Sequence, residues 1–180
     1  MAKLLYSVTM SADGFIAGPG GDMSWLTEHL GADPVMDELI AGVGALLVGA
    51  RTFGGDDPHR GDPEREGAFE GEWDGPQVVL THRPPAQPVT RTTFLDDVRT
   101  AVEAARDAAG GKEYVNVLGA DVARQCLELG ALDEVLTCVA PVFLGDGTRL
   151  FERPGGTRVG LERIRQWHTP RTTNSWYRVV

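Results

Sequence analysis

The sequence predicts an α/β protein with a mostly parallel central sheet, helices on both faces and an antiparallel end. Two short apolar runs, 45–48 and 114–118, have the near-continuous hydrophobicity of parallel strands that are covered on both faces. Each run leads directly into a strand-to-helix junction. The last two strand-like segments, 158–167 and 175–180, have no helix between them, so we expect an antiparallel hairpin at the edge of the sheet.

The clearest junction follows the run 114–118. Its helix has a buried face of Val122, Cys126 and Leu129, and Gly130 would end it in a left-handed cap. Gly119, Ala120 and Asp121 are small enough for a ligand to approach the N–H groups at the positive end of this helix, which is a candidate phosphate site. Turns of this kind also need small residues for steric reasons alone, so both interpretations stay open.

Composition limits the class of protein. A chain of 180 residues, 42% of them apolar and 24% charged, fits one soluble domain spanning 1–180. A formal charge of −9 without a basic run argues against nucleic-acid and membrane binding. The sequence shows no signal peptide and no apolar stretch of about 20 residues, so we expect a cytoplasmic protein. Cys126 and Cys138 are expected to be buried, reduced thiols.

The first 53 residues alternate strands and helices. After a strand at 3–10, Ser11 to Gly14 form a turn and 15–17 return to extended structure. The Gly/Pro-rich segment 18–22 predicts a mobile loop that could act as a lid. Asp33 caps a helix that begins at Pro34. The buried stripe of this helix would be Val35, Met36, Leu39, Ile40 and Val43.

The segment 54–76 is rich in Gly, Pro and charged residues, with Ala68, Phe69 and Trp73 as its only apolar side chains. A loop of this length is either a functional flap or disordered, and the sequence does not decide between them. A strand at 77–80 follows. The next helix would begin at Asp96 and Asp97 and stop at Gly110–Gly111. Its apolar face is Leu95, Val98, Val102, Ala105 and Ala109.

Three junctions should converge at the carboxyl ends of the strands, where open α/β sheets bind ligands. They are Gly49 to Phe53, Thr81 to Arg83 and Gly119 to Val122. Together they offer two arginines, two threonines, a histidine and a helix N-terminus, which is a donor set suited to a phosphorylated nucleotide. Arg51 and Arg83 would be the phosphate clamps.

Several other classes of site are excluded by motif. His29, His59, His82 and His168 lack the spacing of a zinc site, so no metal is expected. No serine lies in a G-x-S-x-G elbow, and the chain has neither a P-loop nor a G-x-G-x-x-G after its first strand.

Five motifs occur in order along the chain: S-A-D-G-F-I-A-G, L-L-V-G-A-R-T-F, V-V-L-T-H-R-P, V-N-V-L-G-A-D and A-P-V-F-L-G-D-G-T-R-L-F. This series resembles the bacterial dihydrofolate reductase superfamily, and most closely its RibD C-terminal domain-like reductases of riboflavin biosynthesis. The match runs from Lys3 to Val180. The resemblance implies a dihydrofolate reductase-like fold and an NADPH-dependent reductase of a small-molecule substrate, often a homodimer.

The resemblance also assigns residues to parts of the cofactor NADP. Three would lie along the nicotinamide: Thr9, Ile16 and Ala17. Three would hold the pyrophosphate or the 2′-phosphate: Gly49, Arg51 and Thr52. Thr81, His82 and Arg83 would lie at the adenosine end, and Leu118, Gly119, Ala120, Asp121 and Val122 beneath the pyrophosphate. The chain departs from many relatives in having Gly49-Ala50-Arg51-Thr52 in place of Gly-Arg-x-Thr, and Ala120 in place of a second glycine.

Asp13 is the candidate for orienting the substrate or donating a proton, although an Asp-Gly turn explains it equally well. Glu28 does not match the spacing of the carboxylate in true dihydrofolate reductases. The leading hypothesis is therefore a reductase of a small heterocyclic or sugar-linked substrate. The alternatives are a nucleotide-binding homodimer without turnover and a partner-binding module with an exposed apolar surface.

Overall fold

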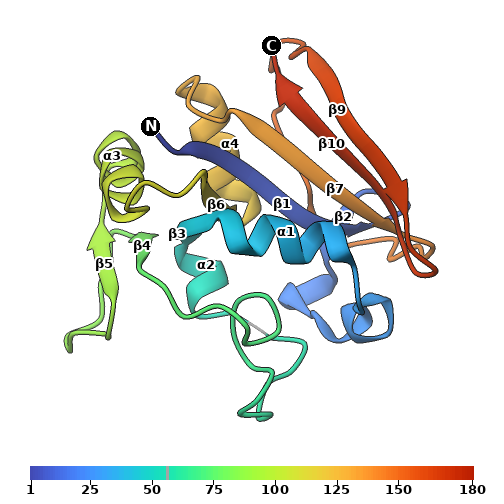
Figure 1. The fold of residues 1–180 in the computed structure, drawn as a ribbon, viewed down its shortest axis with the longest axis horizontal. Coiled ribbons are helices and arrows are strands. Elements are labelled where there is room, and N and C mark those ends of the chain that lie inside the picture. Colours follow the sequence, from blue (N-terminus) through green and yellow to red (C-terminus); the bar gives the residue numbers. More distant parts are fainter. Residues whose placement is uncertain (56) are drawn as a thin grey trace.

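The computed structural model describes residues 1–55 and 57–180. Within these residues, one eight-stranded sheet has the order β5-β4-β3-β6-β1-β7-β10-β9, and β2 pairs with β8 in a small second sheet (Figure 1). The strands are β1 Lys3–Ser11, β2 Phe15–Ala17, β3 Val43–Gly49, β4 Gln77–Leu80, β5 Thr92–Leu95, β6 Tyr114–Leu118, β7 Glu134–Ala140, β8 Thr148–Arg149, β9 Leu161–His168 and β10 Thr173–Val179.

The predicted pairing of the strands is confirmed. The neighbouring strands from β5 to β7 are all parallel, whereas β10 is antiparallel to both β7 and β9. Their carboxyl ends therefore lie along one edge of the sheet. In the order of the strands, β5 lies at one end of the sheet and the hairpin of β9 and β10 lies at the opposite end (Figure 1).

Helices cover both faces of the sheet, as expected. They are η1 Pro19–Gly21, η2 Ser24–His29, α1 Pro34–Gly42, α2 Ala50–Phe53, α3 Val98–Ala108 and α4 Ala120–Glu128. On one face, α1 buries Val35 and Leu39 against residues such as Leu5 and Leu136. On the other face, α3 and α4 bury a second apolar cluster that includes Val102 and Val122 (Figure 1). The two faces of β1 supply both clusters, because successive side chains alternate across a strand.

Local sequence signals set the ends of these helices. Asp33 accepts a hydrogen bond from the Val35 N–H, and Asp97 accepts one from the Thr100 N–H, so each caps its helix. Gly130 follows α4 with a φ of 70°, the left-handed conformation expected of it. The predicted apolar face of α3 also lies in its cluster.

Two helix predictions were wrong at their ends. Leu95 was expected on a helix but ends the strand β5, which pairs with β4. The segment 92–95 was missed because it has only four residues and no alternation of apolar and polar side chains. Val43 was also expected on a helix but begins β3.

Three boundaries elsewhere differ from the prediction. Residues 18–22 contain the short 3₁₀ helix η1 rather than irregular loop alone. β9 begins at Leu161 rather than at residue 158, and Thr173 and Asn174 belong to β10 rather than to the connecting turn. The strand β8 was not predicted, because two residues give no periodic signal.

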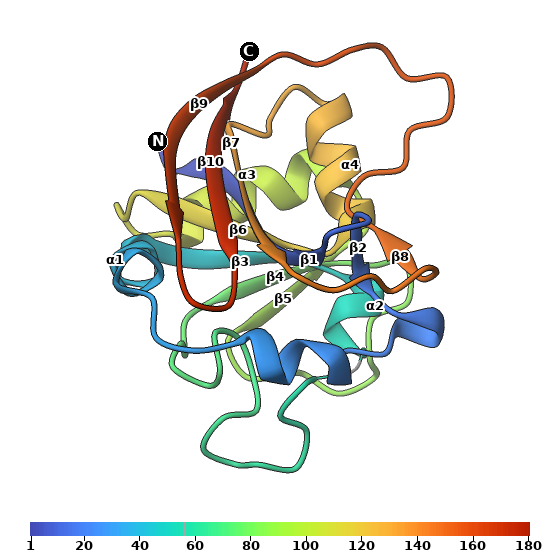
Figure 2. The same ribbon diagram turned by 90° about the vertical axis from the view of Figure 1, so that its right-hand side faces the viewer.

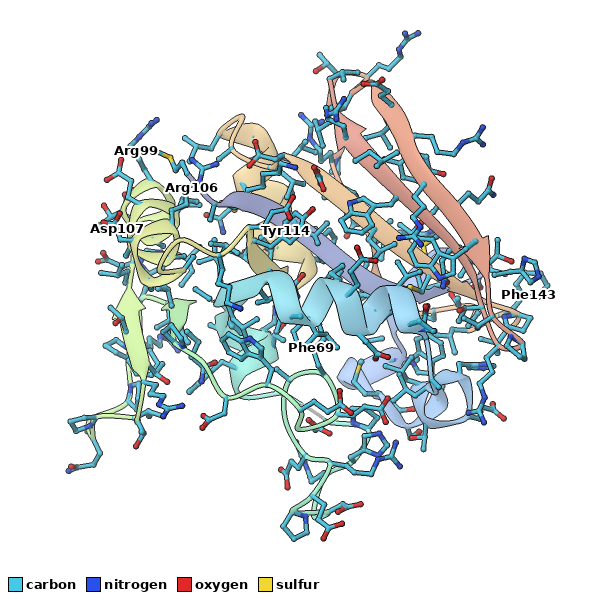
Figure 3. The ribbon with its side chains drawn as sticks, viewed as in Figure 1. Phe69, Arg99, Arg106, Asp107, Tyr114 and Phe143 are labelled. Carbon is cyan, nitrogen blue, oxygen red and sulfur yellow. The ribbon has the colours of Figure 1, made fainter. Side chains whose placement is uncertain are left out.

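The segment 54–76 contains turns and neither helix nor strand in its described residues; Asp56 lies outside them. Its three apolar side chains, Ala68, Phe69 and Trp73, pack against the cluster beneath α1. Phe69 lies below α1 in Figure 3. The Thr27 hydroxyl donates to the Pro58 carbonyl at 3.4 Å, which links this segment to η2. We call residues 54–76 the flap.

Among the described residues, no helix has the length and apolar character needed to cross a membrane.

Candidate nucleotide site

The three predicted junctions lie side by side. They follow β4, β3 and β6, which are adjacent in the sheet, with Gly49 opposite Leu80 and Val48 opposite Leu118. The exposed side chains at this edge include Arg51, Thr52, His82 and Arg83, and Thr81 is half-buried. The structure thus brings together the donor set that the sequence predicts.

The closest contact between two junctions joins Gly119 to Thr52. A Cβ atom on Gly119 would lie 2.6 Å from the Thr52 Oγ1, and the φ of Gly119 is 111°. Glycine is therefore required here twice, once for the backbone conformation and once for space. Gly49 also lies next to the junction after β6. A Cβ on Gly49 would be in ordinary van der Waals contact with Val122 and with the Leu118 carbonyl. The junctions after β3 and β6 therefore pack closely against each other, and Gly119 and Ala120 at the start of α4 stay half-buried.

Charge at the start of α4 is arranged around Asp121. Its carboxylate accepts hydrogen bonds from Arg124 at 2.7 Å and from Gln125 at 2.9 Å. These two bonds, together with the positive charge of Arg51, hold the pKa of Asp121 below its ordinary value. Arg51 of the junction after β3 makes the smallest of these contributions, so positive charge from that junction reaches the start of α4.

The residues expected along the nicotinamide lie next to this edge. β1 is the neighbour of β6, and Thr9 near its carboxyl end is opposite Cys138 on β7. Ala17 is buried in β2, Ile16 is half-buried, and the turn 145–147 approaches them closely, since a Cβ on Gly147 would lie 2.0 Å from the Ala17 carbonyl. At about 4.8 Å per strand, the edge from β4 to β1 spans about 14 Å.

Cys126 and Cys138 are buried free thiols, as predicted. Burial raises the pKa of each to about 12, and the nearby Asp33 carboxylate adds to the effect on Cys138. Both thiols are therefore uncharged and unreactive at neutral pH. No group of three or more potential metal ligands is found in the described part of the chain.

Asp13 is engaged in joining two turns. One carboxylate oxygen accepts from the Ser11 hydroxyl at 2.5 Å and from the Leu144 N–H at 3.1 Å, and the other accepts from the Gly145 N–H at 2.7 Å. The Ser11 bond and then the two backbone bonds hold the pKa of Asp13 below its ordinary value. These contacts favour the structural interpretation over proton donation, because the carboxylate is ionised at neutral pH and its oxygens are occupied.

A buried polar cluster near Thr9 and Cys138 was not foreseen. Asp33 accepts from the Trp167 Nε1 at 2.9 Å and from the Asn174 Nδ2 at 2.9 Å, in addition to capping α1. Asn174 is fully buried, and its Oδ1 has no hydrogen-bond partner among the described residues. The sequence shows Asp33 only as a helix cap, because its other partners lie more than 130 residues away.

The segment containing η2 is tied to the tip of the β9–β10 hairpin. The Arg171 guanidinium donates to the Glu28 carbonyl at 3.1 Å and also to the Leu30 carbonyl. Together with the contact between Thr27 and Pro58, this connects η2, the flap and the hairpin (Figure 2). Of these segments, the flap packs its apolar side chains against the cluster beneath α1.

Comparison with known proteins identifies the family. The profile of the family described as the RibD C-terminal domain matches residues 2–174. The uncharacterized protein YwjB of Bacillus subtilis is 25% identical over 167 residues, which are 92% of each chain.

Two solved structures have the same fold. The putative riboflavin biosynthesis protein of Shewanella sp. PV-4 is similar with a TM-score of 0.75 and 20% identity, covering 100% of this chain and 99% of that one. The diaminohydroxyphosphoribosylaminopyrimidine deaminase/5-amino-6-(5-phosphoribosylamino)uracil reductase of Thermotoga maritima has a TM-score of 0.66 and 17% identity, with coverage of 98% and 56%. The predicted dihydrofolate reductase-like fold is confirmed, and the chain belongs to the RibD C-terminal domain family.

Proposed function

We propose that the chain is an NADPH-dependent reductase that transfers a hydride to a small heterocyclic or sugar-linked substrate. The observation that carries the proposal is that three strand-to-helix junctions lie side by side at one edge of the sheet, where Arg51 and Arg83 are exposed beside the start of α4. Two findings support the proposal: the chain belongs to the RibD C-terminal domain family, and a reductase is among the solved structures with the same fold.

The residues at the sheet edge fit a phosphorylated dinucleotide. Arg51 and Arg83 would pair with phosphate groups, because a guanidinium binds them with two charge-assisted hydrogen bonds. Thr81 and His82 would contact the adenosine end, and Thr9, Ile16 and Ala17 would line the nicotinamide. The bound nicotinamide would supply the hydride. The protein's part is then to position the acceptor carbon and to exclude water.

Alanine variants of the two arginines test this assignment. Arg51→Ala and Arg83→Ala should each weaken NADPH binding about tenfold. Because NADH lacks the 2′-phosphate, the variant that removes the arginine in contact with this phosphate should weaken NADH binding less than NADPH binding. Nicotinamide fluorescence on titration measures both. Arg99→Ala is the control, because Arg99 is exposed on α3, away from the sheet edge (Figure 3). Equal affinities in all three variants would remove these arginines from the site.

The substrate class follows from a relative. The Thermotoga maritima protein is a 5-amino-6-(5-phosphoribosylamino)uracil reductase, and we propose a ribosylamino-pyrimidine as the substrate of this chain. The flap has eight acidic and two basic residues, which makes a phosphate on the substrate unfavourable if the flap covers the site. The rate of NADPH oxidation with the phosphorylated and the dephosphorylated pyrimidine tests this. We expect the dephosphorylated compound to be reduced at least as efficiently.

The occupied carboxylate of Asp13 favours one alternative, a nucleotide-binding homodimer without turnover. NADPH binding without oxidation in the presence of any pyrimidine tested would support it. For either function we expect a homodimer, as the family resemblance implies. The open edge strand β9, with Leu161 and Ile164 50% and 44% exposed, is a candidate surface. Light scattering measures the oligomeric state.

A further inference from the structure

Two cavities lie away from the candidate nucleotide site, and neither is lined by any of the residues assigned to the cofactor. The smaller, of about 290 Å³, is lined by Lys3 and Glu134. These two form an ion pair at 3.0 Å, which accounts for them structurally. The larger cavity, of about 340 Å³, has no comparable ion pair among the described residues of its lining that would explain them structurally.

The larger cavity lies where no helix covers the sheet. The irregular segment 150–160, which we call the strap, runs from β8 past α4 to β9 (Figure 2), and it lines the cavity together with residues of β7 and β10. The floor of the cavity is formed by Val135, Thr137, Tyr177 and Val179, with Leu127 of α4 at one side. The strap closes it with Leu150, Phe151, Arg153, Gly156, Thr157 and Val159, next to Leu161.

The lining is apolar except at a few side chains. The Tyr177 hydroxyl makes no hydrogen bond to any described residue, and the Thr137 hydroxyl has one long bond of 3.5 Å to the Ser175 carbonyl. Such a cavity, at the lower end of the range of about 300–1,000 Å³, is typical of a small-ligand site with a few orienting polar groups.

Arg153 gives the cavity its charge. Its guanidinium donates to the Thr157 carbonyl within the strap at 3.3 Å, and no carboxylate of the described residues lies within ion-pair distance of it. Arg153 is half-buried whereas Glu152 and residues 154–158 beside it are exposed, and Arg153 is among the residues that line the cavity. In a chain of net charge −9 with 26 acidic residues, this unpaired cation is a feature that an anionic ligand would satisfy.

We infer that this cavity is a second ligand site, separate from the nucleotide site, for a small aromatic or aliphatic carboxylate. The apolar body of the ligand would lie between Val159 and the sheet, and its carboxylate would pair with Arg153. The Thr137 and Tyr177 hydroxyls would contact polar substituents. A ligand here would join the strap to β7 and β10.

The probe for the test is 8-anilinonaphthalene-1-sulfonate, an aromatic anion whose fluorescence rises in apolar sites. We expect saturable binding to the full chain, displacement by benzoate but not by the uncharged benzamide, and no displacement by NADPH. Arg153→Gln should weaken binding about tenfold. Arg158→Gln is the matched control, because Arg158 is exposed on the same strap and does not line the cavity. Val159→Trp, which fills the cavity, should abolish binding.

Three results would overturn the inference. They are equal affinity of the probe for Arg153→Gln and Arg158→Gln, displacement of the probe by NADPH, and unchanged binding to a folded Val159→Trp variant. Arg153→Gln leaves Val159 and the other apolar lining residues in place, so it stays informative if Val159→Trp does not fold. Light scattering of the unliganded protein must show the same oligomeric state for wild type and Arg153→Gln. A change of state would mean that a second copy of the chain occupies the cavity.

Discussion

The two sides of the proposed active site are built differently. On the nucleotide side, three junctions of consecutive residues lie next to one another because their strands are neighbours, and their contact is set by main chain at Gly119. On the α1 side, η2, the flap and the hairpin tip are held by side chains of distant residues, such as Arg171 with the Glu28 carbonyl and the apolar flap residues Phe69 and Trp73 against the cluster beneath α1. The first side depends mainly on backbone conformation, and the second on side-chain hydrogen bonds and apolar packing between distant residues.

This difference bears on how each side should respond to mutation. Gly119 has no good substitute, because its φ of 111° is strained for any residue with a side chain and a Cβ there would lie 2.6 Å from the Thr52 hydroxyl. A cluster of side chains loses stability in proportion to the polar groups left without partners. The variants that follow separate these two behaviours.

Gly119→Ala should have the largest effect. Its Cβ would meet the Thr52 Oγ1, and its φ of 111° is strained for alanine, so we expect a loss of about 3–5 kcal/mol of stability or a shift of the junction. Either response should weaken NADPH binding by more than tenfold. Urea unfolding and nicotinamide fluorescence measure the two effects.

Gly130→Ala is the control at the other end of α4. Its φ of 70° is also strained for alanine, but a Cβ there has nothing within 4 Å. We expect a loss of about 1–2 kcal/mol of stability and unchanged NADPH affinity. If the two variants lost the same affinity, the contact between Gly119 and Thr52 would not define the site.

Asp33→Ala tests the side-chain cluster. It removes a helix cap and leaves the Trp167 N–H and the Asn174 amide buried without an acceptor, so we expect a loss of about 2–4 kcal/mol. Asp97→Ala removes only an exposed cap of α3 and should cost about 1 kcal/mol. Equal losses in urea unfolding would show that Trp167 and Asn174 do not depend on Asp33.

Asp13→Asn should have the smallest effect, and one that depends on pH. Because the folded pKa of Asp13 lies below its unfolded value of about 3.9, its ionised form stabilises the fold above that pH, and the contribution is lost as pH falls through the folded pKa. The urea midpoint of Asp13→Asn should therefore lie below that of wild type from pH 5 to pH 8, and the gap should narrow below about pH 4.

Asp107→Asn, on the exposed side of α3, is the control for the Asp13 variant (Figure 3). It should show no such gap. Unchanged stability of Asp13→Asn together with loss of NADPH oxidation would restore Asp13 as a catalytic residue.

The sequence predicted the parts of the molecule that depend on short stretches of chain. Buried runs, helix caps and the glycine at 119 each act within a few residues, so the mostly parallel sheet and the convergence of its three junctions followed from them, whereas the order of the strands did not. β5 and β8 were missed because strands of four and two residues carry too little periodicity. The cluster of Asp33, Trp167 and Asn174 was missed because side-chain pairing across the whole chain has no local signal.

The most direct test of the account is a titration of the wild-type protein with NADPH and, separately, with NADH, followed by nicotinamide fluorescence. We predict saturable binding of both, with NADPH preferred by about tenfold because one more phosphate pairs with an arginine at the sheet edge. Absence of binding of either nucleotide at millimolar concentration would contradict the account and leave the fold without its proposed reductase function.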